Sequence, residues 1–151
     1  MSGRCIKMII NSDIKDVFLI GSVISRLCGL TPFSSVEVFQ IELCVVESVN
    51  NAIEHAYGNE PGHPVEVTFA LHPNRLTFEI CDTGKTMGTK YLPQKGTQSF
   101  EFDPNDLDEL PEGGMGLSII NEIMDQVVYT TSAGINKLTL TKFFNANETK
   151  R

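Results

Sequence analysis

The sequence predicts an α+β fold, a two-layer sandwich in which about three helices cover one face of a mixed sheet. Apolar residues recur at helical spacing in three segments and alternate at strand spacing in two hairpins. Along the chain these segments follow one another as strand, two helices, hairpin, helix and hairpin, a grouped order that is typical of α+β folds. With 151 residues, we expect one domain over 1–144 and a polar tail over 145–151.

The first half of the chain is expected to hold an edge strand and two helices. Residues 7–11 read as the strand, and Ser12 is the candidate N-cap of the first helix. Ser34 or Ser35 caps the second helix, which is expected to run without a break over 36–57 because no Pro or Gly interrupts it.

The second half is expected to hold two β-hairpins with a helix between them. Alternating apolar residues place the four strands at 65–71, 76–82, 127–131 and 137–144. The intervening helix begins directly after Gly113-Gly-Met-Gly116. The connection over 85–112 has no clear period, and a connection of that length inside a domain is usually functional or disordered.

The charge of the chain argues against general nucleic-acid binding. Net charge is −7 and the pI is near 4.9, whereas affinity for phosphate backbones comes from Lys and Arg. No segment is apolar over the ~20 residues that span a bilayer, and the N-terminus has no signal-peptide core. Four cysteines fit no zinc or redox spacing. We therefore expect a cytoplasmic protein without membrane contact.

A polar stripe runs along the second predicted helix. At about 100° per residue, five side chains fall within an arc of roughly 80°, and they are Gln40, Cys44, Glu47, Asn51 and His55. The rest of this helix is apolar, so the stripe either faces water at the edge of the core or faces a ligand. In the second case the Asn51 carbonyl suits Mg²⁺, and Glu47, one turn away, could orient or deprotonate a nucleophile.

Asp82-Thr-Gly84 ends the second strand of the first hairpin, where Asp and Gly most often only make a turn. The functional alternative is a carboxylate that accepts a hydrogen bond from a ligand amino group, with Gly84 keeping the backbone clear of that ligand. Asp-Thr-Gly also occurs in aspartic proteases, but two long helices before the motif count heavily against an all-β protease.

Gly113-Gly114-Met115-Gly116 precedes a helix and suits a phosphate, because glycines let backbone N–H groups approach it and the helix N-terminus adds free donors. Glycine pairs before helices also occur at ordinary turns, so this motif is weak alone.

Together, the three motifs have the order and spacing of the GHKL ATPase superfamily, and the chain most resembles the bacterial anti-sigma factor serine kinases. The resemblance implies the Bergerat-type ATP-binding fold, with ATP and Mg as cofactors. It implies that Glu47 is the catalytic base, that Asn51 is the Mg²⁺ ligand, and that Asp82 binds the adenine amino group beside Gly84. It places a glycine box next to the phosphates and a mobile ATP lid at 85–112; the box comprises Gly114, Met115, Gly116 and Leu117.

The resemblance further implies a serine/threonine protein kinase that phosphorylates an anti-anti-sigma antagonist protein, sequesters a sigma factor and forms a homodimer. Two departures stand out. Asn136 lies where the superfamily often has the threonine that supports adenine, and we expect it to stand in for that residue. The second half of the lid is acidic, and no Lys or Arg occurs from 96 to 136. This favours an alternative, a nucleotide-responsive binding module with little phosphoryl transfer.

Overall fold

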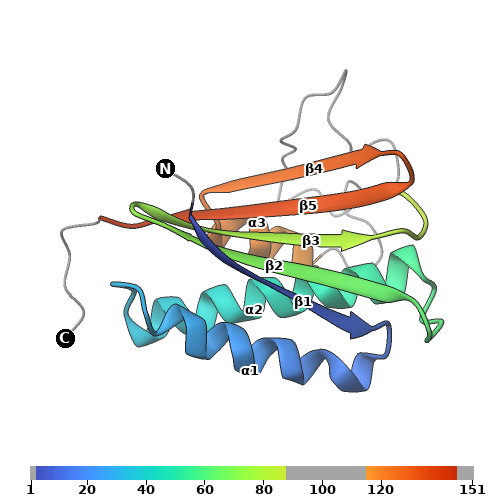
Figure 1. The fold of residues 1–151 in the computed structure, drawn as a ribbon, viewed down its shortest axis with the longest axis horizontal. Coiled ribbons are helices and arrows are strands. Elements are labelled where there is room, and N and C mark those ends of the chain that lie inside the picture. Colours follow the sequence, from blue (N-terminus) through green and yellow to red (C-terminus); the bar gives the residue numbers. More distant parts are fainter. Residues whose placement is uncertain (1–2, 88–114, 146–151) are drawn as a thin grey trace.

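The computed structural model describes residues 3–87 and 115–145, and arranges them as a five-stranded sheet with helices against one face (Figure 1). The sheet order is β1-β2-β3-β5-β4. Along the chain the elements are β1 (Arg4–Asn11), η1 (Ile14–Asp16), α1 (Val17–Cys28), α2 (Ser35–Asn51), η2 (Ala52–Ala56), β2 (Pro64–His72), β3 (Arg75–Asp82), α3 (Met115–Ile123), β4 (Gln126–Ser132) and β5 (Ile135–Phe143). The α+β two-layer architecture expected from the sequence is confirmed.

A mixed sheet was expected from the sequence, whereas all four pairings among the described strands are antiparallel. The helix count between strands explains this. Two helices, α1 and α2, bring the chain back to the end at which β1 finished, so β2 runs against β1. One helix, α3, carries the chain from the end of β3 to the opposite end, so β4 runs in the direction of β3 and β5 pairs between them (Figure 1).

The core lies between the sheet and the helices. Alternate residues of β2 and β3 point into it, and each of these two rows is fully or nearly fully buried: Val65, Val67 and Phe69 in β2, and Leu76, Phe78 and Ile80 in β3. Because side chains alternate across a strand, the next inward position of β3 is Asp82. The inward-facing apolar row of β3 therefore ends in a carboxylate, which lies at the edge of the core.

The helix starts follow the local sequence with one exception. Ser34 and Glu37 form the capping box of α2, since Glu37 N donates to Ser34 Oγ at 3.2 Å and Ser34 N donates to Glu37 Oε1 at 2.9 Å. At the first helix, Asp13 is the N-cap of η1 in place of the expected Ser12. The Ser12 hydroxyl instead donates to the carbonyl of Glu60 at 2.6 Å and ties the start of that segment to the loop before β2.

The second helix does not continue as a regular α-helix to residue 57. Its last turn, η2, is a π-helix, in which Tyr57 N donates to Ala52 O at 3.1 Å. A π turn adds one residue to the helical turn and rotates the following side chains relative to the α-helix; such turns are frequent at functional sites. No helix in the described part of the chain has the length and apolarity that a membrane crossing needs.

Candidate functional site

A cavity of about 200 Å³ opens where η2 and the end of α2 face the last residues of β3 and the strands beside it. It is the place where two of the three sequence motifs meet, since Asn51 and Asp82 both contribute to its wall. The full lining consists of Ser48, Asn51, Ala52, His55, Ala56, Ile80, Asp82, Lys85, Thr86, Met87, Tyr129 and Leu138.

Asp82 is the buried carboxylate of this cavity, with 9% of its surface exposed. Its Oδ1 accepts hydrogen bonds from Asn136 Nδ2 at 2.7 Å and from Gly84 N at 3.0 Å. Burial raises the pKa of Asp82 above its ordinary value, and these two hydrogen bonds, which favour the ionised form, oppose that rise. Among the described residues no hydrogen bond reaches Oδ2, so this oxygen keeps its acceptor capacity.

Asn136 lies opposite Asp82 in the register of the β3–β5 pair and is 1% exposed. Besides Asp82, its Nδ2 donates to Gly84 O at 3.0 Å. Its Oδ1 accepts from the hydroxyls of Thr131 at 3.0 Å and Thr86 at 3.2 Å. From the sequence, Asn136 was expected to replace a threonine that supports adenine. In the structure, both its Nδ2 and its Oδ1 are hydrogen-bonded to protein groups.

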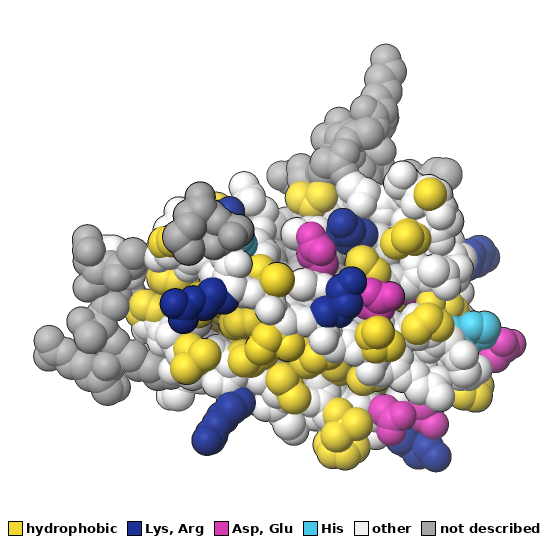
Figure 2. All heavy atoms as spheres, viewed as in Figure 1, with side chains coloured by type: hydrophobic (Ala, Val, Ile, Leu, Met, Phe, Trp, Pro, Cys, Tyr) yellow, Lys and Arg dark blue, Asp and Glu magenta, His cyan; other side chains and the backbone are white. Residues whose placement is uncertain are grey.

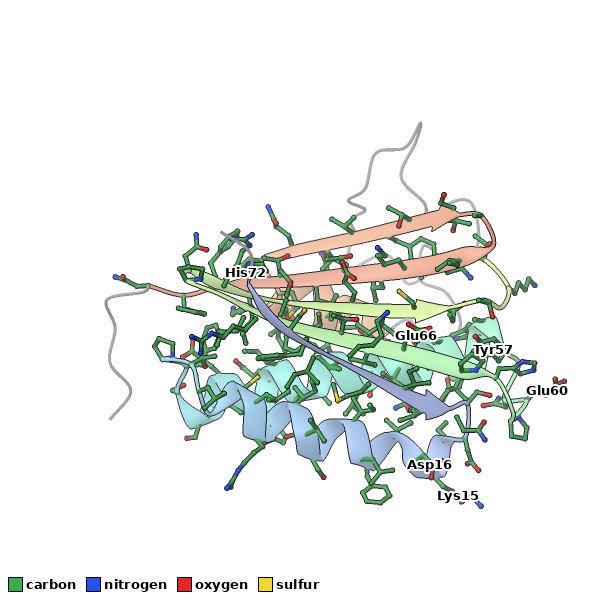
Figure 3. The ribbon with its side chains drawn as sticks, viewed as in Figure 1. Lys15, Asp16, Tyr57, Glu60, Glu66 and His72 are labelled. Carbon is green, nitrogen blue, oxygen red and sulfur yellow. The ribbon has the colours of Figure 1, made fainter. Side chains whose placement is uncertain are left out.

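The turn that follows Asp82 is held from the helix side as well. Thr83 N donates to Tyr57 Oη at 2.8 Å, and Tyr57 Oη in turn donates to Pro64 O at 2.7 Å. The Tyr57 ring stacks on His63 with centroids 4.7 Å apart. Figure 3 shows Tyr57 at the end of the molecule where η2, the end of β3 and the loop before β2 come together. The sequence does not indicate this role of Tyr57, because its hydroxyl partners lie on other elements.

On the helix side, the predicted polar stripe is divided. Glu47 and Asn51 are half-buried one turn apart on α2, but only Asn51 lines the cavity. The Asn51 Nδ2 is buried without a hydrogen-bond partner among the described residues. Cys44 is fully buried, which raises the pKa of its thiol to about 12 and keeps it neutral. His55 is exposed on η2 and lines the cavity.

The predicted glycine box is described only in part. Gly114 lies outside the described residues, as does 88–112 of the predicted lid, while the backbone of Met115, Gly116 and Leu117 forms the first turn of α3. At the other end of α3, Lys142 Nζ donates to Ile123 O at 2.8 Å.

The direction of α3 follows from this contact. Lys142 pairs with the start of β3, so the C-terminus of α3 lies at the end of the sheet away from Asp82. The N-terminus of α3 therefore points toward the end of the sheet that carries Asp82. Among the described residues, no three His, Cys, Asp or Glu side chains come together as a metal cluster.

Comparisons with known proteins identify a family and several relatives. A sequence profile of the family described as histidine kinase-like ATPase domain matches residues 10–142. Two proteins named serine-protein kinase RsbW are similar over most of their length. The one from Bacillus subtilis (strain 168) is 26% identical over 141 residues, 93% of this chain and 86% of that protein. The one from Bacillus pumilus (strain SAFR-032) is 30% identical over 112 residues, 72% of this chain and 67% of that protein.

Solved structures share the fold at lower identity. The RsbU and RsbW domains of Rv1364c from Mycobacterium tuberculosis match with a TM-score of 0.62 and 15% identity, over 93% of this chain and 32% of that chain. The present chain thus spans about a third of that protein's chain. The Acinetobacter baumannii histidine kinase AdeS matches with a TM-score of 0.52 and 14% identity, over 91% of this chain and 68% of that chain.

Proposed function

The chain belongs to the histidine kinase-like ATPase family, and we propose that it is an anti-sigma factor serine/threonine kinase that uses Mg-ATP. It phosphorylates a serine of a small anti-anti-sigma antagonist protein, and it sequesters a sigma factor when that antagonist has been phosphorylated. One observation carries the proposal: the buried carboxylate of Asp82 ends an apolar strand row inside a cavity and keeps one oxygen free. The relatives named serine-protein kinases support the finer assignment.

The residues around the cavity suit an adenine nucleotide. Asp82 Oδ2 is placed to accept from an amino group, and the flanking Ile80 and Leu138 offer apolar surface to a flat base. The side-chain Nδ2 of Asn51 has no hydrogen-bond partner among the described residues. The oxygen of the same amide is a ligand of the type that Mg²⁺ takes together with waters and phosphate oxygens. In this proposal Asn51 is thus the metal ligand, and Asp82 and Gly84 bind the adenine ring of the nucleotide.

Mg-ATP, when bound, supplies the phosphoryl group and neutralises charge on the phosphates. The N-terminus of α3, which begins at Met115, faces the Asp82 end of the sheet, so its free N–H groups and positive dipole end favour phosphate there. Gly114, Met115, Gly116 and Leu117 are proposed to form this phosphate site. Glu47 lies one turn from Asn51, outside the cavity wall, and is proposed to accept the proton of the partner's serine hydroxyl as the general base.

The outer surface bears on the proposed homodimer. β1 is an edge strand, which leaves one side of its backbone unpaired. Exposed apolar side chains lie on β1, η1 and α1, and they are Ile6, Ile9, Ile14, Phe18, Leu19 and Val23. Figure 2 shows hydrophobic side chains across the face of the molecule that carries β1 and α1. A contiguous exposed apolar patch usually marks an interaction surface. A monomeric mass in light scattering would contradict the homodimer.

The proposal is tested by incubating the protein with γ-labelled ATP, Mg²⁺ and a candidate antagonist protein that carries a serine. We expect label to appear on that serine, and we expect Glu47→Gln to abolish this transfer. Glu54→Gln is the matched control, because Glu54 is exposed on η2 and undergoes the same chemical change. Absence of transfer with every candidate, despite tight binding of ATP, would refute the kinase.

The second candidate function is a nucleotide-responsive binding module that holds a partner with little phosphoryl transfer. The sequence between 96 and 136 favours it, since this stretch contains no Lys or Arg that could stabilise charge on a transferred phosphoryl group. The two candidates differ in one measurement. A binding module would hold its partner with different affinity in ATP and in ADP, but it would transfer no γ-labelled phosphate to that partner.

A further inference from the structure

We propose that Asn136 is a positioning residue for the ligand-binding carboxylate, holding Asp82 so that Oδ2 alone faces the nucleotide. The inference rests on the proposed nucleotide site and adds a residue that acts through Asp82 rather than on the ligand. Three features of the described structure support it. Every donor and acceptor of the Asn136 amide is hydrogen-bonded, only one of the two Asp82 oxygens is hydrogen-bonded to described residues, and Asn136 also contacts the segment that begins at Gly84.

The Asn136 amide has no hydrogen-bonding capacity left for a ligand. Its two N–H hydrogens meet Asp82 Oδ1 at 2.7 Å and Gly84 O at 3.0 Å. Its two acceptor positions meet the hydroxyls of Thr131 and Thr86 at 3.0 and 3.2 Å. An amide offers two donors and two lone pairs, so all four are used. Asn136 is also 1% exposed, which removes competition from water.

The orientation of this amide is fixed by the network. If its oxygen and nitrogen were exchanged, an amide oxygen would face Asp82 Oδ1 and Gly84 O at the distances given above, and each contact would set two acceptors against each other. The amide hydrogens can therefore point only toward Asp82 and Gly84.

This orientation decides which oxygen of Asp82 binds the ligand. Oδ1 takes hydrogen bonds from Asn136 on β5 and from Gly84 N in its own turn, so it is held from two directions. The carboxylate plane is fixed in consequence, and Oδ2 is the oxygen that remains available. A donor beside a carboxylate also favours the ionised form, which accepts a stronger hydrogen bond than the neutral acid does.

The same side chain attaches the start of the 85–112 segment to the sheet. Gly84 O, Lys85 O at 3.5 Å and the Thr86 hydroxyl all lie within reach of Asn136. A change at Asn136 would thus release both the carboxylate and the first residues of the predicted lid. The other titratable groups that line the cavity are His55, Lys85 and Tyr129.

The test measures affinity for Mg·ADP as a function of pH, from about pH 5 to pH 8, in the parent protein and in two variants. Asn136→Asp replaces the donor by a like charge beside Asp82, and Asn136→Thr keeps one hydroxyl donor. We expect Asn136→Asp to weaken binding about ten-fold or more and to move the pH midpoint of binding upward, because charged hydrogen bonds are worth about that much. Asn136→Thr should show a smaller loss in the same direction.

Asn74→Asp is the matched control, because Asn74 is exposed in the β2–β3 turn at the opposite end of the hairpin and undergoes the same chemical change. It should bind Mg·ADP like the parent. Should Asn136→Asp fail to fold by circular dichroism, Asn136→Thr carries the comparison. Two folded variants with the parent's affinity and the parent's pH midpoint would overturn the proposal.

A measurement on the nucleotide-free protein separates this inference from the proposed function. Carboxyl-carbon NMR follows the titration of Asp82 directly, and its pKa should rise when Asn136 is replaced. An unchanged Asp82 titration in Asn136→Thr and Asn136→Asp overturns the positioning role, whatever the protein binds. Unchanged nucleotide affinity in Asp82→Asn instead overturns the nucleotide site itself.

Discussion

Gly84 lies so close to the carbonyl group of Ala56 that a Cβ atom at this position would overlap its oxygen, and would lie 2.8 Å from Cδ1 of Tyr57. The backbone continues this contact, since Lys85 N donates to Ala56 O at 2.8 Å. The glycine after Asp82 therefore lets the end of β3 pass against the π turn that ends the second helix. From sequence, its role was assigned to clearance for a ligand; the structure adds clearance for the protein's own backbone.

We predict that Gly84→Ala separates these two segments, because the obstructing atoms belong to the backbone and cannot rotate away. Overpacking of this kind costs about 1–3 kcal/mol of unfolding free energy, and the displaced Asp82 should also lose nucleotide affinity. Gly58→Ala is the control. Gly58 has φ +59° and open space around it, so alanine there adds only backbone strain of about 1–2 kcal/mol. Urea unfolding should give similar unfolding free energies for the two variants, whereas calorimetric titration should show weaker ADP binding in Gly84→Ala alone. Equal ADP affinities would contradict the prediction.

A second prediction concerns the cost of keeping Asp82 ionised. Burial raises its pKa, so the folded protein holds a proton there more tightly than the unfolded chain does. The stability contributed by the protonated form is present at low pH and is lost as pH rises through the folded pKa. An asparagine side chain cannot ionise, so nucleotide-free Asp82→Asn should be at least as stable as the parent near neutral pH.

The same substitution should nevertheless weaken ADP binding about ten-fold or more, since it removes a charged acceptor worth on the order of 1.5–3 kcal/mol. Thermal unfolding over a pH series checks the first half, and calorimetric titration checks the second. A variant that is both less stable and equally able to bind would show that Asp82 serves the fold rather than the ligand.

Sequence patterns predicted those parts of the fold that depend on local spacing. Period-two alternation located both hairpins to within a few residues, and the cap expected at Ser34 or Ser35 located the start of α2, where the structure has Ser34. Counting the helices between strands predicts that β2 runs against β1 and that β4 runs in the direction of β3. The all-antiparallel sheet also requires β5 to lie between β3 and β4, which this count does not predict. The π turn was not predicted; its Ala56 O accepts a hydrogen bond from Lys85 N, which comes from a distant part of the chain and is not visible in the local sequence.

Of the residues singled out in the sequence, Asp82 and Asn51 line the same cavity, whereas Glu47 does not. Asp82 and Asn51 stand out in sequence because each is a polar residue in an apolar row. The groups that hold Asp82 in place come from far along the chain: Asn136 is separated from it by 54 positions, and Tyr57 reaches Thr83 across 26. Such contacts are set by strand register and helix packing, which no local pattern encodes.

A third prediction tests the anchor of α3. Lys142 is mostly buried, donates to the carbonyl of Ile123 at the helix C-terminus and lies 4.0 Å from Asp125. A cation there satisfies an unpaired carbonyl and matches the negative end of the helix dipole. Lys142→Met should therefore lower the unfolding free energy by about 1–2 kcal/mol. Lys137→Met is the control, because its 3.9 Å pair with Glu79 is exposed and worth at most about 1 kcal/mol. Equal losses in urea unfolding would refute the special role of Lys142.

The last prediction separates Glu47 from Asn51, which lie one turn apart on α2 but differ in their access to the cavity. Asn51 lines it and its Nδ2 has no hydrogen-bond partner among the described residues, so Asn51→Ala should weaken Mg·ATP binding and phosphoryl transfer together. Glu47 is outside the wall, so Glu47→Gln should keep nucleotide affinity and lose transfer by about 10²–10⁴-fold, the usual worth of a general base.

The measurement is a transfer rate beside a nucleotide affinity for each folded variant, with Glu54→Gln as the control for the loss of one carboxylate. If the polar stripe merely faces water, both substitutions change only stability, by roughly 1–3 kcal/mol. Transfer at the parent rate by Glu47→Gln would remove Glu47 from the mechanism. Intact ATP binding without any transfer in the parent would instead favour the binding module, in which Asn51 and Asp82 still hold the nucleotide but no residue is needed to activate a serine.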